Sequence, residues 1–286
     1  MFKRLYELRE NPFQLHSDIR FLYVNDKVRE ALAAMAYGIQ SRKGIVLLTG
    51  DVGTGKTTLL KALLDDLRRK QTCVGYIFNA WQSGPDFLEL VLNEFGIEYP
   101  PGASRAQMII LLNRWLMERY TAGQPVVLIV DEAQNLSLEV LEEVRLLTNQ
   151  EAADGKLLQV VLAGQPELVK TMAQPRLRPL AQRVAFWSRT LPLSFEQVRE
   201  YVQRRLQVAG ASNVNIFSDD ALRQIHHYTH GVPRLVNLFC EHALIRGYVE
   251  NTKVITPNII EMVAHDVTMP ILAVAPDLSR MAKATE

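Results

Sequence analysis

The chain has 286 residues, enough for one large domain or two smaller ones, and 48% of them are hydrophobic, so an ordinary core can form. Its 32 Lys and Arg residues against 31 Asp and Glu residues leave a formal charge of +1, which gives no argument for nucleic acid or an acidic membrane surface as a partner. The two cysteines, Cys73 and Cys240, exclude a disulfide scaffold and fit a reducing compartment.

Residues 1–43 are predicted to be a leader. The start, Met1–Glu7, is charged where a signal peptide is apolar, and no segment reaches the roughly 20 apolar residues of a membrane span. We therefore expect a cytoplasmic protein with no membrane span of its own. Within the leader, Asn11–Phe13 interrupts any helix through its proline, and the apolar spacing from Asp26 to Gln40 predicts a helix.

From residue 44 onward, apolar strands alternate with helices. The strands are expected at 45–49, 73–78, 126–130, 157–163 and 186–191. Strands that are apolar throughout are typically buried on both faces, so the pattern predicts an α/β fold with a parallel five-stranded sheet flanked by helices. This α/β domain is expected to span residues 44–192.

The pattern becomes helical after Pro192. Four helices are expected, and they begin near Ser194, Ser218, Pro233 and Pro257. They predict an all-helical domain over 193–267. Residues 268–286 contain two prolines and no periodicity, so we expect a flexible tail there.

The most informative motif is a complete G-x-x-x-x-G-K-T phosphate loop between the first strand and the helix after it, the context that the motif needs. Its glycines allow backbone N–H groups to surround phosphates, Lys56 reaches the β and γ phosphates, and Thr57 can hold Mg²⁺. The motif therefore predicts a nucleoside-triphosphate site. The loop and the residue after it are Gly50, Asp51, Val52, Gly53, Thr54, Gly55, Lys56, Thr57 and Thr58.

Two carboxylates, Asp131 and Glu132, follow the third strand. Together with the loop, they predict catalysis: Asp131 would complete the Mg²⁺ shell with Thr57, and Glu132 would orient and polarise the attacking water. Phosphoryl transfer needs little covalent help, so charge placement and water positioning supply most of the rate. Without the loop, an acidic helix N-terminus would be the better interpretation.

Two amides follow strands at the same edge of the predicted sheet: Asn79 after the second strand and Gln165 after the fourth. Ligands of open α/β sheets lie beyond the carboxyl ends of the strands, so both amides are expected to reach the γ-phosphate region. Asn79 could hold Glu132 away from water until a partner binds, and Gln165 could touch the γ-phosphate. The alternative for each is an amide that stabilises a turn.

Four arginines are further candidates. Arg176, Arg178 and Arg183 lie between the fourth and fifth strands, and Arg234 opens a helix of the helical domain. A guanidinium supplied across a subunit boundary can stabilise transition-state charge, and Arg234 could fold over the nucleotide. A single arginine is more often a solvated surface residue, so these roles depend on a resemblance.

The phosphate loop is accompanied by six shorter segments, namely Leu8–Phe13, Phe21–Tyr23, Leu128–Leu136, Glu142–Asn149, Leu162–Leu168 and Leu180–Arg183. Together they resemble an AAA+ ATPase with a helical lid. Within that superfamily the chain resembles the general secretion pathway protein A (ExeA) group and its pilus- and exopolysaccharide-associated relatives. The resemblance covers about residues 2–266.

The resemblance implies that the chain uses ATP and Mg²⁺, with the loop as Walker A and the two carboxylates as Walker B. It implies that Asn79 is the glutamate switch and that Gln165 occupies the sensor-1 place. Arg183 would be the arginine finger and Arg234 would be sensor 2. The Pro12–Phe13 pair resembles the leader segment that lines the adenine site.

The expected function is an ATPase that forms a homo-oligomeric ring or helical filament with nucleotide at its subunit boundaries. Through a protein client it would drive or regulate the assembly of a secretion, pilus or polysaccharide-export machine, in the cytoplasm or peripherally at the inner membrane. The module also resembles TniB and TnsC, so an ATP-switched, DNA-binding regulator of transposition is the alternative. A small-molecule kinase is the weaker hypothesis, because the helical domain is not inserted over an acceptor pocket.

Overall fold

The computed structural model describes residues 2–78 and 84–274. The chain divides into two compact units, one of Val24–Leu191 and one that joins Met1–Tyr23 to Pro192–Glu286. The residues predicted as a single leader are thus shared between the units, with the division after Tyr23.

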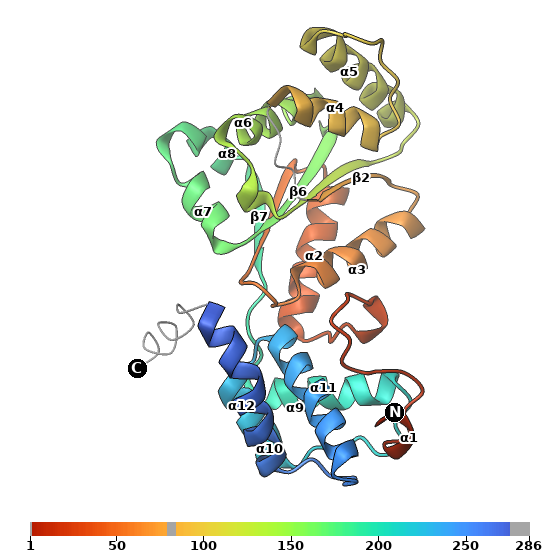
Figure 1. Ribbon diagram of the computed structural model, residues 1–286. Helices are drawn as coiled ribbons and strands as arrows, with labels where there is room; N and C mark the ends of the chain where they lie inside the picture. The colour runs from red at the N-terminus through yellow and green to blue at the C-terminus, as the bar shows by residue number, and fades with distance from the viewer. Residues whose placement is uncertain (1, 79–83, 275–286) are drawn as a thin grey trace. The chain divides into compact units, whose positions relative to one another are not determined.

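The unit of Val24–Leu191 is built on a five-stranded parallel sheet in the order β2-β3-β6-β1-β7 (Figure 1). The strands are β1 (Ile45–Thr49), β2 (Cys73–Phe78), β3 (Val126–Asp131), β6 (Leu158–Gly164) and β7 (Val184–Arg189). β1, β3 and β6 are buried along their whole length, as expected of central strands covered on both faces. The prediction of this sheet is confirmed.

Helices cover both faces of this sheet (Figure 1). One face packs on α2 (Asp26–Gln40) and α3 (Lys56–Arg69). The other packs on α4 (Gly84–Glu94), α5 (Arg105–Thr121), α6 (Leu138–Leu147), α7 (Pro166–Met172) and α8 (Arg178–Ala181). A short hairpin of β4 (Glu151–Ala152) and β5 (Gly155–Lys156) precedes β6, and it was not predicted.

The second unit contains the four expected helices, α9 (Phe195–Val208), α10 (Asp219–Thr229), α11 (Pro233–Val249) and α12 (Pro257–Val274). The N-terminal α1 (Phe2–Leu5) and the short turn η1 (Ile19–Phe21) belong to the same unit. α12 continues through residues 268–274, where we expected the tail to begin. A proline removes one N–H donor and often only kinks a helix, so Pro270 is compatible with this later end.

The N-terminal segment is part of the core of this second unit. The Phe13 side chain is 0% exposed and meets the Phe217 ring edge-to-face, with centroids 5.9 Å apart. The Arg205 guanidinium donates a hydrogen bond to the Pro12 carbonyl oxygen. Among the residues that the structure describes, no helix is both long enough and apolar enough to cross a bilayer.

Candidate active site

The phosphate loop joins β1 to α3 at the carboxyl edge of the sheet. Gly53 and Gly55 have φ values of 80° and 100°, a backbone region that glycine enters without strain. A Cβ on Gly50 would lie 1.9 Å from the Thr190 hydroxyl oxygen, so that position has no room for a side chain. Gly55 is the N-cap of α3 and offers no capping side chain, so the helix presents its N-terminal N–H groups and positive dipole end at this edge.

Lys56 is buried at the start of α3, with 6% of its surface exposed. Its ammonium donates to the carbonyl oxygens of Gly50 at 2.7 Å and Asp51 at 3.1 Å. Burial lowers the pKa of Lys56, while the nearby carboxylates, first among them Glu132, act in the opposite direction. The loop therefore holds a cation among carbonyl groups at the place where phosphates would bind.

Asp131 is fully buried at the end of β3 and accepts hydrogen bonds on both carboxylate oxygens. Its Oδ2 accepts from the Thr57 hydroxyl at 3.2 Å and from the Tyr76 hydroxyl at 3.0 Å, and its Oδ1 accepts from the Glu132 N–H at 2.9 Å. Threonine and aspartate oxygens suit Mg²⁺, which usually takes one or two protein ligands and keeps waters and phosphate oxygens for the rest. Among the described residues, no group of three or more His, Cys, Asp or Glu side chains could bind a metal ion by itself, without water or phosphate ligands.

Tyr76 is a member of this site that we did not predict. It lies on β2 opposite Ile129, two residues before Asp131, so only the register of β2 with β3 brings its hydroxyl to the carboxylate. Burial raises the pKa of Tyr76 and the charge of Asp131 raises it further, which keeps the phenol protonated as a donor.

A Tyr76→Phe variant is expected to lose about 1–3 kcal/mol of unfolding free energy, because it removes one donor from a buried carboxylate. Urea denaturation of the variant without nucleotide measures this loss. In an Asp131→Asn background the same change should cost much less, since the buried charge is gone. An equal loss in both backgrounds would show that the Tyr76 hydroxyl contributes independently of the charge of Asp131, which would contradict this account.

Glu132 follows Asp131 with a left-handed backbone, at φ 54°. Its Oε2 accepts from the Gln134 side-chain amide at 2.6 Å, and Gln134 Oε1 in turn accepts from the Gln165 N–H at 3.0 Å. Gln165 is the N-cap of α7 after β6, and β6 lies between β1 and β3, so Gln165 stands between the loop and the two carboxylates. We did not predict that the Gln134 side chain would connect Glu132 to Gln165; we call this connection the Gln134–Gln165 bridge. Asn79, which we expected to restrain Glu132, lies outside the described residues.

Arg183 lies at the opposite edge of the sheet from the loop. The next residue, Val184, pairs with Ile45 at the start of β1, whereas the loop follows Thr49 at its end. Four residue steps of about 3.3 Å separate these two edges by about 13 Å. The structure therefore does not bring Arg183 to the phosphate loop of its own chain.

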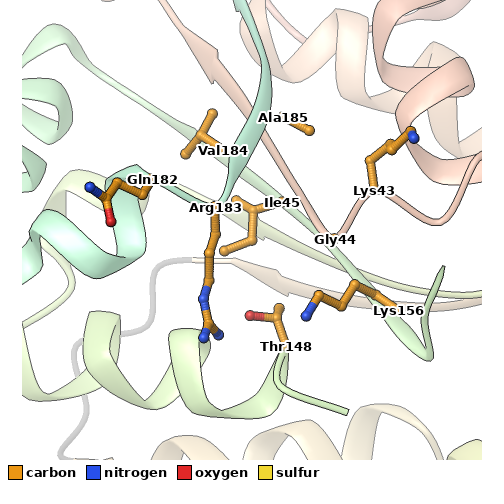
Figure 2. A pocket seen from close by; sticks show the side chains of 9 residues that line it. All are labelled: Lys43, Gly44, Ile45, Thr148, Lys156, Gln182, Arg183, Val184 and Ala185. Atoms are coloured by element: carbon orange, nitrogen blue, oxygen red, sulfur yellow. The ribbon is translucent and has the colours of Figure 1, made fainter. Parts of the chain in front are cut away.

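The Arg183 side chain lies in a basic pocket of about 240 Å³ (Figure 2). Its Nη1 donates to the Arg145 carbonyl oxygen at 2.8 Å, and also to the Asn149 side chain. Figure 2 shows that the guanidinium and the Lys156 ammonium both extend toward Thr148. Lys43 also lines this pocket, but Figure 2 shows its ammonium directed away from these two groups, and Lys156 pairs with Glu151.

The remaining predicted residues lie elsewhere. Arg176 pairs with Glu139 at 3.4 Å, and Arg178 is the first residue of α8. Arg234 lies in the first turn of α11, in the second unit. The same unit contains the buried pair Pro12–Phe13.

Residues 39–172 match the family described as "AAA domain". This range includes the phosphate loop, both carboxylates and the Gln134–Gln165 bridge. The chain contains an AAA domain over these residues. The predicted ATPase activity is thereby supported at the level of the family, and the carboxyl-edge cluster is its candidate active site.

A curated relative, general secretion pathway protein A of Aeromonas hydrophila, is 42% identical to this chain over 268 residues. The match covers 94% of this chain and 49% of the relative, so the chain spans about half the length of that protein. The resemblance to the general secretion pathway protein A group is confirmed.

Solved structures show the same fold. Cdc6p of Pyrobaculum aerophilum has a TM-score of 0.68 at 23% identity, covering 88% of this chain and 71% of Cdc6p. The RuvB Holliday junction branch migration motor of Thermotoga maritima has a TM-score of 0.60 at 16% identity, covering 89% of this chain and 73% of RuvB. At these identities the similarity establishes the fold alone, and the predicted P-loop fold is confirmed.

Proposed function

We propose that this chain is an Mg²⁺-dependent ATPase whose active site is completed by a second copy. The observation that carries the proposal is the contact of Thr57 with Asp131 beside a glycine-built phosphate loop. These are the two oxygen ligands and the anion cradle that a magnesium-bound triphosphate needs.

Each residue of the site has a distinct task. The loop N–H groups and Lys56 bind the phosphates, and Gln165 contacts the γ-phosphate. Thr57 and Asp131 would hold Mg²⁺, which would neutralise charge on the phosphate oxygens when bound. Glu132 orients the attacking water and accepts its proton. Asn79 is proposed to restrain Glu132 until a partner arrives.

The arginine finger is proposed to act between copies. Arg183 and the loop lie at opposite edges of one sheet, so the guanidinium can serve only the nucleotide of a neighbouring chain. Repetition of this head-to-tail contact gives a ring, or a helical filament if it does not close. We propose that Arg234 responds to the nucleotide as sensor 2, and that the segment at Pro12–Phe13 borders the adenine site.

The client is proposed to be a protein of a secretion, pilus or polysaccharide-export machine whose assembly the ATPase drives or regulates. The support is the 42% identity to general secretion pathway protein A over nearly the whole of this chain. We propose that it acts in the cytoplasm or peripherally at the inner membrane. The alternative, an ATP-switched DNA-binding regulator, rests on resemblance alone, and ATP-dependent, salt-sensitive binding of duplex DNA would favour it.

A Lys56→Ala variant tests the nucleotide site. We expect its affinity for ATP with Mg²⁺ to fall on the order of 100-fold, because hydrogen bonds from charged groups contribute about 1.5–3 kcal/mol and 1.4 kcal/mol is a factor of ten. Titration calorimetry measures the affinity. Lys70→Ala, at the exposed end of the same helix, is the control and should bind normally. Normal binding by Lys56→Ala would contradict the proposed site.

A further inference from the structure

One side chain, Gln134, connects two parts of the active site. Its Nε2 donates to Glu132 Oε2 at 2.6 Å, and its Oε1 accepts from the Gln165 N–H at 3.0 Å. A carboxylate accepts and a backbone N–H donates, so only one orientation of the amide satisfies both partners. Leucine, isoleucine or methionine at this position could make neither bond.

The bridge is held from both ends. Gln134 lies in the short turn η2 (Ala133–Asn135), which the Asn135 N–H closes by donating to the Glu132 carbonyl oxygen at 3.0 Å. On the other side, a Cβ on Gly164 would lie 2.9 Å from Gln134 Oε1. The absence of a side chain at Gly164 thus leaves room for the amide against the end of β6.

The bridge opposes a competing contact. Among the carboxylates that act on the buried Lys56, Glu132 has the largest effect. Without a restraint, Glu132 would be drawn toward this ammonium, and an ion pair between them would remove one group from water activation and the other from phosphate binding. The charge-assisted hydrogen bond from Gln134 to Glu132 Oε2 opposes this movement of the carboxylate.

We infer that Gln134 is a positioning residue for hydrolysis: it holds Glu132 in the orientation for water activation and ties that orientation to the segment at Gln165. The inference rests on the proposed role of Glu132. Gln134 touches neither substrate nor metal in this account, so all of its effect on turnover passes through Glu132.

The test is a double-mutant cycle with Gln134→Leu, Glu132→Gln and both changes together. Gln134→Leu should lower kcat about 10- to 100-fold, the value of one hydrogen bond to a charged group, with KM changed less than about 2-fold. In the Glu132→Gln background the same change should add nothing, because effects that pass through one residue are not additive. Gln174→Leu, an exposed glutamine, is the control and should keep wild-type turnover.

Gln134→Glu separates positioning from a structural effect. A carboxyl at this position can donate to Glu132 only when protonated, so its activity relative to wild type should rise as the pH is lowered. Because Gln134→Glu is nearly isosteric with the wild type, it still tests the inference if the Gln134→Leu variant does not fold. Wild-type kcat in Gln134→Leu, additive losses in the cycle, or a pH profile of Gln134→Glu parallel to wild type would overturn the inference. Wild-type turnover in Glu132→Gln would instead refute the proposed role of Glu132.

Discussion

An Arg183→Ala chain is expected to bind ATP normally and to hydrolyse it about 10³–10⁵-fold more slowly, the range over which an arginine finger acts. The reason is the geometry of the sheet: Arg183 precedes β7 at the amino edge, and the phosphate loop follows β1 at the carboxyl edge. The lost guanidinium would therefore be missing from the neighbour's site. Steady-state ATPase assays measure the rate of hydrolysis, at protein concentrations high enough for the chains to assemble.

Mixing the variants distinguishes action between copies from action within one chain. An Arg183→Ala chain retains its phosphate loop, and a Lys56→Ala chain retains its Arg183. Each alone should be inactive, and their mixture should recover part of the activity at mixed boundaries. Arg176→Ala and Arg178→Ala are matched controls from the same stretch and should hydrolyse normally. A mixture that forms assemblies but stays inactive would exclude the intersubunit finger.

A Glu132→Gln chain is expected to keep its affinity for ATP and to lose turnover by about 10²–10⁴-fold, the contribution of a well-placed general base. Glutamine preserves the size of the side chain but cannot take a proton from water. Because ATP then stays bound, assemblies that need it should persist. Rapid-quench kinetics measure the chemical step, and light scattering or size exclusion follows the assemblies.

Glu167→Gln is the matched control for this change. Glu167 lies in the first turn of α7 at the same edge of the sheet and also acts electrostatically on Lys56, yet it is exposed. It should retain turnover within about a factor of two to three, since exposed charge pairs are worth less than 1 kcal/mol. If both variants lost turnover equally, the rate would depend on the negative charge at this edge of the sheet. It would then not depend on a general base at position 132.

Much of the fold follows from local patterns. The apolar runs at β1, β3 and β6 indicate strands buried on both faces, and Ser104 and Ser194 each form a capping box at the start of the helix that follows. The phosphate loop was predictable because its glycines and lysine are contiguous, and local backbone geometry is enough to form it.

The partners of the carboxylates were not predictable in this way. Tyr76 reaches Asp131 through the register of two strands, and Gln134 reaches Gln165 because β6 lies next to β3. Such neighbours depend on strand order, which a single sequence does not encode locally. The same applies to the leader: Phe13 fills a core made by residues some 200 positions later, such as Phe217, and its flanking sequence carries no signal of that burial.

The most direct test of the central claim is an experimental structure of the assembled protein with Mg²⁺ and a slowly hydrolysed ATP analogue. We predict a triphosphate in the loop that follows β1, with its γ-phosphate within hydrogen-bond distance of Lys56 of the same chain and Arg183 of the next. A nucleotide bound elsewhere, or a γ-phosphate with no guanidinium from a neighbouring copy, would contradict this account.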